Sequence, residues 1–264
     1  MTKVFLGGTL YPEVCLPPSP HGRFDWWCLT SFYDAGSKWC KFYMEHNKLF
    51  NGYIMDSGAF SLLGSQKHKT NGVDWDEYVE RYAACVNKYD VDNFIELDLD
   101  AIIGLPEVER LRAKLEHLTN KQCMPVWHKS RGWGYWERMI SKYKYVCIGG
   151  IAAWDIKPNE VGIFRHLLRA SNEAGCKVHG LGFTNTQKLA RYPFYSVDSS
   201  SWNGGWKWGR LPRFAGGKII TIEKPAGRRL KTSNGEWRPV VEYSFREWLK
   251  YCYYMDDEEA DNRK

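Results

Sequence analysis

Aspartates recur in this sequence immediately after short apolar runs, at points where a strand would end. The four in such positions are Asp56, Asp98, Asp100 and Asp198. A single aspartate there is explained well enough as the cap of a following helix. Several carboxylates gathered at one edge repel one another, so such an arrangement normally persists because it serves catalysis or binds a metal. The pattern therefore favours an active site built from strand ends.

A histidine and several glycines occupy the same kind of position. His128 follows the run Met124–Trp127, while Gly149, Gly150 and Gly182 follow two later runs. Histidine can transfer a proton or read a hydrogen-bonding group, and glycine lets a flat ligand approach the backbone closely. Core packing of the histidine and tight turns at the glycines are the alternative explanations.

The apolar runs alternate with amphipathic stretches of helical period, which is typical of parallel strands joined by helices. Asp74 with Glu77 predicts a capped helix, and Pro106 fits the first turn of the next one. The expected strands are Val4–Leu6, Tyr53–Met55, Phe94–Leu99, Met124–Trp127, Tyr145–Ile148, Lys177–Leu181 and Tyr195–Val197, with Ile219–Ile222 as either an eighth strand or part of an insertion.

This succession predicts an α/β protein, a TIM-like (β/α)8 barrel that forms a single domain over residues 1–264. A doubly wound sheet is the alternative, but no GxGxxG motif follows the first expected strand. In a parallel barrel the reactive groups lie at the carboxyl ends of the strands. All the aspartates above should therefore meet on one rim.

The bulk composition is that of a folded protein with free thiols. Hydrophobic residues make up 44% and charged residues 26% of the chain, and the eight cysteines contain no CxxC pair. The histidines show no HxxxH or HExxH spacing, so the sequence predicts no metal and no cofactor. With no signal peptide and no apolar run of membrane-spanning length, a cytoplasmic location without membrane contact is expected.

Positive charge is concentrated near the C-terminus. Residues Trp202–Lys231 contain eight Lys or Arg and one acid, a net charge of +7 in a chain whose total is +6. Together with nearby indoles, this basic segment predicts contact with a nucleic acid, although a solvated charged face is the simpler alternative. The predicted contact residues are Trp206, Trp208, Arg210, Arg213, Arg228 and Arg229. The acidic tail, residues 256–264, is expected to fray.

Around these residues the chain resembles a known family. The run GYIMDSGAFS is similar to the DSGGFQ signature of the tRNA-guanine transglycosylases, and ELDLD, PVWH, IGGIA, HGLG and SVDSSSW follow in that superfamily's order. MDSGAFS with PVWH and SVDSSSW looks closest to its bacteriophage and bacterial DNA-modifying branch, the DpdA-type proteins. The resemblance covers roughly Tyr53 to Trp202.

The resemblance implies a pentosyltransferase that replaces guanine with a free 7-deazaguanine base of the preQ0 type. By position, Asp198 would be the nucleophile that forms a covalent glycosyl intermediate, and Asp56 would move protons to and from the purine. The tRNA enzymes carry their nucleophile three residues further on, where this chain has Ser201. The residues expected to bind the base are Asp100 or Asp98, His128, Gly149, Gly150, Gly182, Ser57 and Phe60.

The family's zinc subdomain, which helps to hold tRNA, has no counterpart here. Its absence and the basic segment favour DNA as the partner, with tRNA as the alternative. Two further alternatives are a non-catalytic barrel that binds nucleic acid as a partner subunit, and a glycoside hydrolase whose tryptophans hold sugars. The oligomeric state is open.

Overall fold

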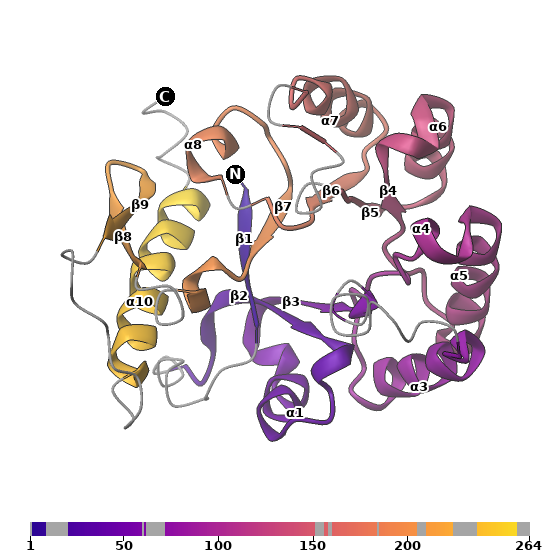
Figure 1. The fold of residues 1–264 in the computed structure, drawn as a ribbon, viewed down its shortest axis with the longest axis horizontal. Helices are drawn as coiled ribbons and strands as arrows, with labels where there is room; N and C mark the ends of the chain where they lie inside the picture. The colour runs from indigo at the N-terminus through magenta and orange to yellow at the C-terminus, as the bar shows by residue number, and fades with distance from the viewer. Residues whose placement is uncertain are drawn as a thin grey trace.

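Seven parallel strands form a single curled sheet at the centre of the molecule (Figure 1). The computed structural model describes residues 2–8, 21–59, 61, 72–150, 156–157, 160–183, 185–204, 210–223 and 237–257. The strands run in the spatial order β3-β2-β1-β7-β6-β5-β4. Their bounds are β1 Lys3–Gly7, β2 Phe24–Ser31, β3 Phe50–Asp56, β4 Val126–Trp127, β5 Tyr145–Ile148, β6 Lys177–Gly180 and β7 Ser196–Ser199.

The two edges of this sheet are connected through a short extended segment. Phe94 forms a parallel bridge with Met55 of β3, and Ile95 forms one with Met124, two residues before β4. The predicted strand Phe94–Leu99 is therefore reduced to two bridging residues. The structure therefore agrees in part with the predicted TIM-like barrel, because its parallel sheet curls most of the way round.

Helices cover the outer face of the curled sheet, and they begin and end where local sequence chemistry requires. Asp74 caps its helix as predicted, since its Oδ1 accepts from the Glu77 backbone N–H at 3.0 Å. The helices are α1 Lys38–Glu45, α3 Trp75–Lys88, α4 Asp100–Ile103, α5 Leu105–Thr119, α6 Gly132–Lys142, α7 Ile163–Glu173 and α8 Thr186–Leu189, with short 3-10 turns at Phe32–Asp34 (η1), Asn47–Leu49 (η2), Lys129–Arg131 (η3) and Ser201–Gly204 (η4).

Side-chain alternation along the strands explains how one end of the sheet becomes polar. Ile54, Val126 and Cys147 point inward and form part of a small apolar core inside the curl. The next inward position lies two residues further along each strand. Those positions are Asp56, His128 and Gly149. The predicted site residues thus face the same space because they continue the inward faces of buried strands.

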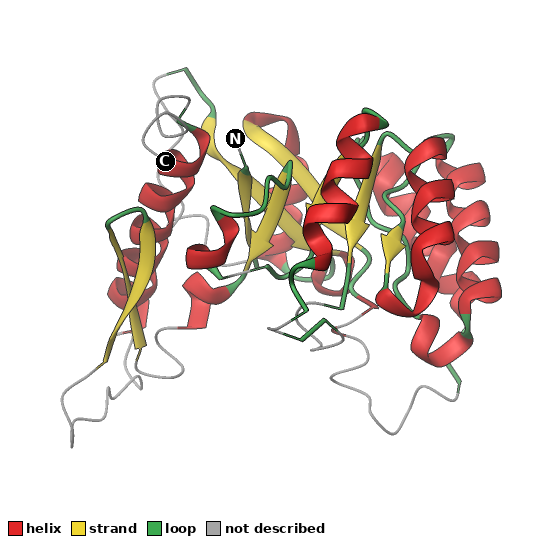
Figure 2. Ribbon diagram, turned by 90° about the horizontal axis from the view of Figure 1, so that it is seen from above, coloured by secondary structure: helices red, strands yellow, loops and turns green. Residues whose placement is uncertain are grey.

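The C-terminal region adds a hairpin and a helix to the outside of the curled sheet, where Phe245 packs against Trp26 of β2 with ring centroids 5.2 Å apart. β8 (Arg210–Ala215) and β9 (Lys218–Glu223) pair as an antiparallel hairpin that lies beside α10 (Trp237–Asp256), at one side of the molecule in Figure 2. Glu247 of α10 accepts from the Phe214 backbone N–H at 2.7 Å and so ties the hairpin to the helix. Ile219–Ile222 therefore belongs to this addition and is not the eighth strand of a barrel.

Four further features can be compared with what the sequence led us to expect. The strand β2 was not predicted, although it lies between β1 and β3 in the sheet. Asp256 is the last residue of α10 and not the start of a frayed tail. The seven cysteines within the described ranges are free thiols, as expected. No helix of the described part of the chain has the length and apolar character needed to cross a membrane.

Candidate active site

Asp198 is anchored through one of its two carboxylate oxygens. Oδ1 accepts from the Gly182 backbone N–H at 2.7 Å, and His179 Nε2 lies 3.3 Å from the same atom. Oδ2 makes no hydrogen bond with another residue of the described ranges, and it faces the backbone of Gly7, where an added Cβ would lie 3.8 Å away. The carboxylate is thus held in orientation while one oxygen remains available to a ligand.

His179 connects Asp198 to the interior of the curled sheet. Its ring is fully buried, and its Nδ1 lies 2.6 Å from Ser196 Oγ. Ser196 Oγ in turn hydrogen-bonds the Tyr145 hydroxyl. Sequence reasoning missed His179, although a histidine at an inward position of a short buried strand was a usable signal. The chain of contacts fixes the ring and therefore the direction from which Asp198 is approached.

Asp56 ends β3 on the same rim. Burial raises the pKa of Asp56 to about 6 against the lowering effect of its Gly58 hydrogen bond, and the negative charges of Asp198 and Asp98 add to the increase. Gly58 donates its backbone N–H to Asp56 Oδ1 at 2.8 Å. It has φ +77°, and an added Cβ would lie 2.5 Å from Tyr33, so only glycine fits there. This carboxyl can exchange a proton near neutral pH.

Asp98 and His128 form a hydrogen-bonded pair, with 2.5 Å between Asp98 Oδ1 and His128 Nε2. Burial alone would lower the pKa of His128, but the hydrogen bond to Asp98 and the charges of Asp98 and Asp100 raise it above its usual value. An added Cβ at Gly149 would lie 2.7 Å from His128 Cε1. Gly149 therefore leaves room for the imidazole and for Val126, whose Cγ1 would also lie 2.7 Å from an added Cβ.

Asp100 is engaged differently, because both of its oxygens are taken by one guanidinium. Arg131 donates from Nε at 2.6 Å and from a terminal nitrogen at 2.7 Å. The Arg131 side chain is 1% exposed and also contacts Glu96, which in turn pairs with Arg112 at 3.1 Å. Burial opposes the change, but the Arg131 hydrogen bonds hold the pKa of Asp100 below its usual value. Sequence reasoning missed this ion-pair network.

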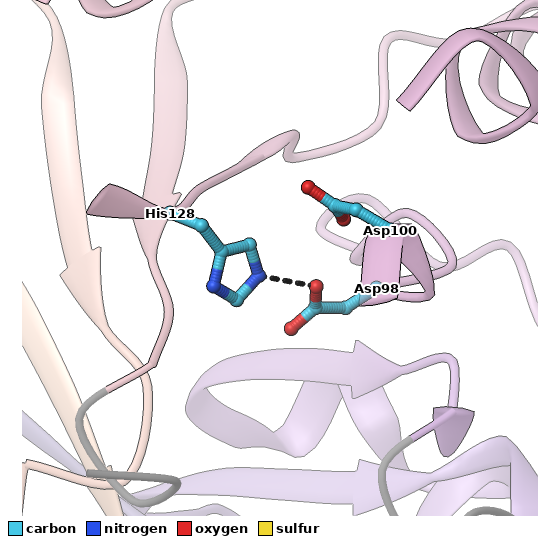
Figure 3. Close-up of side chains that lie close together, drawn as sticks. All are labelled: Asp98, Asp100 and His128. Carbon is cyan, nitrogen blue, oxygen red and sulfur yellow. Dashed lines mark hydrogen bonds and ion pairs between the residues drawn. The ribbon is translucent and has the colours of Figure 1, made fainter. Parts of the chain in front are cut away.

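Asp98, Asp100 and His128 point toward one another in Figure 3. One possible metal-ligand atom from each lies within 4.8 Å of the others. Three such atoms could hold a divalent cation. Arg131, however, already neutralises Asp100 through both oxygens, and His128 is turned toward Asp98. A metal would have to compete with the Arg131 guanidinium for Asp100, so these residues fit a metal poorly.

The remaining predicted base-binding residues are placed as follows. Gly182 lies at the rim and donates to Asp198. Gly150 has φ +76°, typical of a tight turn after β5. Ser57 is buried, and its hydroxyl has no partner among the described residues. Phe60 lies outside the described residues.

The predicted nucleic-acid contacts are described only in part. Arg210 and Arg213 are exposed on β8 of the hairpin. Trp206, Trp208, Arg228 and Arg229 lie outside the described residues. The alternation of β8 places Arg210 and Arg213 on opposite faces of the strand, so the two arginines have different surroundings.

Comparison with known proteins gives the fold and no family. No family model matches the chain, and no curated protein matches it by sequence. A solved structure from Coccidioides immitis, assigned as a fructose-1,6-biphosphate aldolase, is 9% identical, covers 99% of this chain and 92% of its own, and has a TM-score of 0.56. The carboxyl transferase domain of Rhizobium etli pyruvate carboxylase is 14% identical over 74% of this chain, with a TM-score of 0.42. This chain spans 39% of that one's length. The first likeness indicates a TIM-like fold and nothing about substrate.

Proposed function

We propose that this protein exchanges guanine in DNA for a 7-deazaguanine base, through a covalent intermediate on Asp198. The observation that carries the proposal is the pairing of two unlike carboxylates on one rim. Asp198 has one oxygen anchored and one available, while Asp56, at the end of β3 on the same rim, has a pKa of about 6. A carboxylate with an available oxygen, together with a second carboxyl that can exchange a proton near neutral pH, is typical of a nucleophile with an acid–base partner.

The reaction divides into two displacements. Asp198 Oδ2 attacks C1′ of the target nucleotide, the bond from C1′ to guanine breaks, and protonated Asp56 gives its proton to the departing base. The incoming base then attacks C1′ through its ring nitrogen, the bond to Asp198 breaks, and the Asp56 carboxylate accepts the proton that this nitrogen loses. Two inversions retain the configuration, and Asp56 ends as it began.

We assign recognition of the purine to Asp98 and His128, which lie on the rim away from Asp198. Asp98 has one oxygen that makes no hydrogen bond with a described residue, so it can accept from the amino edge of guanine. His128, held by Asp98 and raised in pKa, can donate to the purine carbonyl. Asp100 is better assigned to positioning, since Arg131 occupies both of its oxygens.

DNA is the proposed partner in preference to tRNA. The sequence contains no CxCxxC zinc motif, and the basic hairpin offers exposed arginines beside the rim loops. We also propose that Phe94–Ile95 serves as the eighth strand, which would close the sheet into a complete barrel. A closed barrel would bring Asp98 opposite Asp198 across its mouth.

The decisive experiment offers three substrates to the same preparation. DNA and tRNA labelled in guanine are incubated with a 7-deazaguanine base, and a labelled oligosaccharide is incubated in parallel. Release of guanine from DNA with incorporation of the added base supports the proposal. Exchange confined to tRNA would change the partner, cleavage of the oligosaccharide would indicate a glycoside hydrolase, and binding of DNA without exchange would indicate a non-catalytic subunit.

A further inference from the structure

A polar cavity of about 750 Å³ lies next to the rim, between the β8–β9 hairpin and the turn that follows β7. Its wall includes Ser200 and Ser201, which come directly after the strand that carries Asp198. Asp34 and Ser61, also on the wall, follow β2 and β3 at the same end of the sheet. The cavity therefore opens beside the proposed reaction centre. Its size is within the range of about 300–1,000 Å³ usual for ligand sites.

Apart from the Asp34 carboxyl, whose pKa burial raises, the groups on the wall are suited to an anion that also accepts hydrogen bonds. Arg210 supplies a cation that forms no ion pair with a described side chain, and Ser200, Ser201 and Thr221 supply hydroxyls. Hydroxyls and arginine are the side chains that most often contact phosphate oxygens in nucleic-acid complexes.

Trp248 gives an independent indication that something polar belongs in this region. It lines the cavity, is 3% exposed, and its indole N–H has no acceptor among the described residues. Buried donors in folded proteins normally have a partner, because leaving one unsatisfied costs free energy. An oxygen of a bound anion would supply the missing acceptor after a small shift of the indole, because the nitrogen itself is not exposed.

We infer that this cavity binds a phosphodiester of the DNA strand next to the target nucleotide. The inference rests on the proposed function for the identity of the strand, but its chemistry depends only on Arg210, the wall hydroxyls and Trp248. A flipped nucleotide must be held through its neighbours, since the stacking and pairing that fixed it in the duplex are lost. A phosphate held beside Ser200 would position C1′ of the next nucleotide near Asp198.

The hairpin offers matched variants to test this site. Arg210 and Thr221 face the cavity, whereas Arg213 and Ile222 lie on the opposite face by strand alternation. Arg210→Gln and Arg213→Gln remove the same charge from one strand, and Thr221→Asp and Ile222→Asp add the same charge to the other. Long-range effects of net charge are therefore equal within each pair.

The probe is a single-stranded oligodeoxythymidylate, which contains no guanine and cannot undergo exchange. Its affinity is measured over a range of salt concentrations for the full chain, with thermal unfolding as a check on folding. Arg210→Gln should weaken binding about tenfold and reduce the slope of log affinity against log salt by about 0.7. Thr221→Asp should weaken binding at least as much, and both opposite-face variants should weaken it less.

Equal effects within each pair, or no binding of the probe by the unaltered protein, would overturn the inference. Tighter binding of an oligouridylate than of the DNA probe would overturn the assignment to DNA. Because the probe is inert, this result is separable from the exchange assay. If Arg210→Gln loses affinity but the unaltered protein performs no exchange, the phosphate site is supported and the transglycosylase activity is rejected. If the unaltered protein performs exchange but the paired variants do not differ, the activity is supported and the phosphate site is rejected.

Discussion

Two sides of the rim carry aspartates at equivalent strand ends, yet their surroundings are opposite. Asp100 lies against Arg131, whose guanidinium occupies both carboxylate oxygens and belongs to a buried network with Glu96 and Arg112. Asp198 is held by a backbone N–H and a buried histidine, with one oxygen left available. A carboxylate neutralised by a buried cation stabilises structure, whereas one held through a single oxygen can offer its other oxygen to a ligand.

The pKa values of the rim aspartates also depend on whether a guanidinium is in contact with them. The Arg131 hydrogen bonds hold the pKa of Asp100 low, whereas burial and neighbouring carboxylates raise the pKa of Asp56 to about 6. The rim aspartate without a guanidinium partner is therefore the one that can exchange a proton near neutral pH. Residue type and strand position alone would have given these aspartates the same role.

The strongest test of this difference makes the same change on both sides. Asp198→Asn should lower base exchange by at least about 10³-fold, because a covalent nucleophile has no substitute. Asp100→Asn should retain exchange to within about tenfold. Denaturing gels of unaltered protein with DNA and no incoming base should show a DNA-linked band that Asp198→Asn lacks. Exchange by Asp198→Asn at the normal rate would remove Asp198 from the mechanism.

The same two variants should reverse their order when stability is measured. Asp100→Asn leaves the buried Arg131 facing a neutral amide, and it should lower the free energy of unfolding by about 3 kcal/mol. Asp198→Asn should change it less, since Asp198 is held by one backbone N–H and one imidazole and not by a guanidinium on both oxygens. Urea denaturation of both variants measures this. Equal losses would mean that the Arg131 pair is no more important to the fold than the Asp198 contacts.

Much of the rim could be read from the sequence, because alternation is a local property. Asp56 and His128 each follow a buried inward residue by two positions, so placing the apolar runs also placed these side chains. β2 was not predicted because its residue types, FDWWCLTS, do not alternate between apolar and polar along the strand, although its burial alternates in the first half. The Gly216-Gly217 turn between β8 and β9, with positive φ at both residues, was a hairpin signal that could have been used.

The partners of the carboxylates could not be read in this way. Arg131 lies 31 residues beyond Asp100, and His179 lies 19 residues before Asp198. Whether an aspartate at a strand end meets a guanidinium or an imidazole depends on how neighbouring loops pack, which no local pattern encodes. For that reason the sequence identified the acids but could not separate Asp98 from Asp100.

Titration of Asp56 should appear in stability as well as in catalysis. Its pKa is raised from 3.8 to about 6, so the folded state holds the proton more tightly than the unfolded chain does. Relative to Asp56→Asn, the unaltered protein should therefore lose about 2 kcal/mol of unfolding free energy as the pH rises from about 4 to about 6. Denaturation of both proteins at pH 4 and pH 8 measures the change. A difference that does not depend on pH would contradict a raised pKa.

A smaller effect is expected from the residue that orients Asp198. His179→Gln should lower kcat about tenfold while leaving KM nearly unchanged, because one hydrogen bond to a charged group is lost without loss of a substrate contact. The Ser196→Ala variant removes the contact on the other side of the ring and serves as a comparison. If both variants raised KM and left kcat unaltered, His179 would act on substrate binding and not through Asp198.

The smallest effect is expected from removing metal ions. Asp98, Asp100 and His128 offer three ligand atoms within 4.8 Å of one another, so a metal would bind at this cluster if it bound on the rim. A metal there would compete with the Arg131 guanidinium for Asp100 and with His128 for Asp98, and the proposed displacements need no Lewis acid. Exchange should therefore be unchanged after dialysis against a chelator, and adding zinc should not increase it. Activity lost on chelation and restored by zinc would instead make this cluster a metal centre, and Arg131→Ala, which frees Asp100, should then bind the ion more tightly.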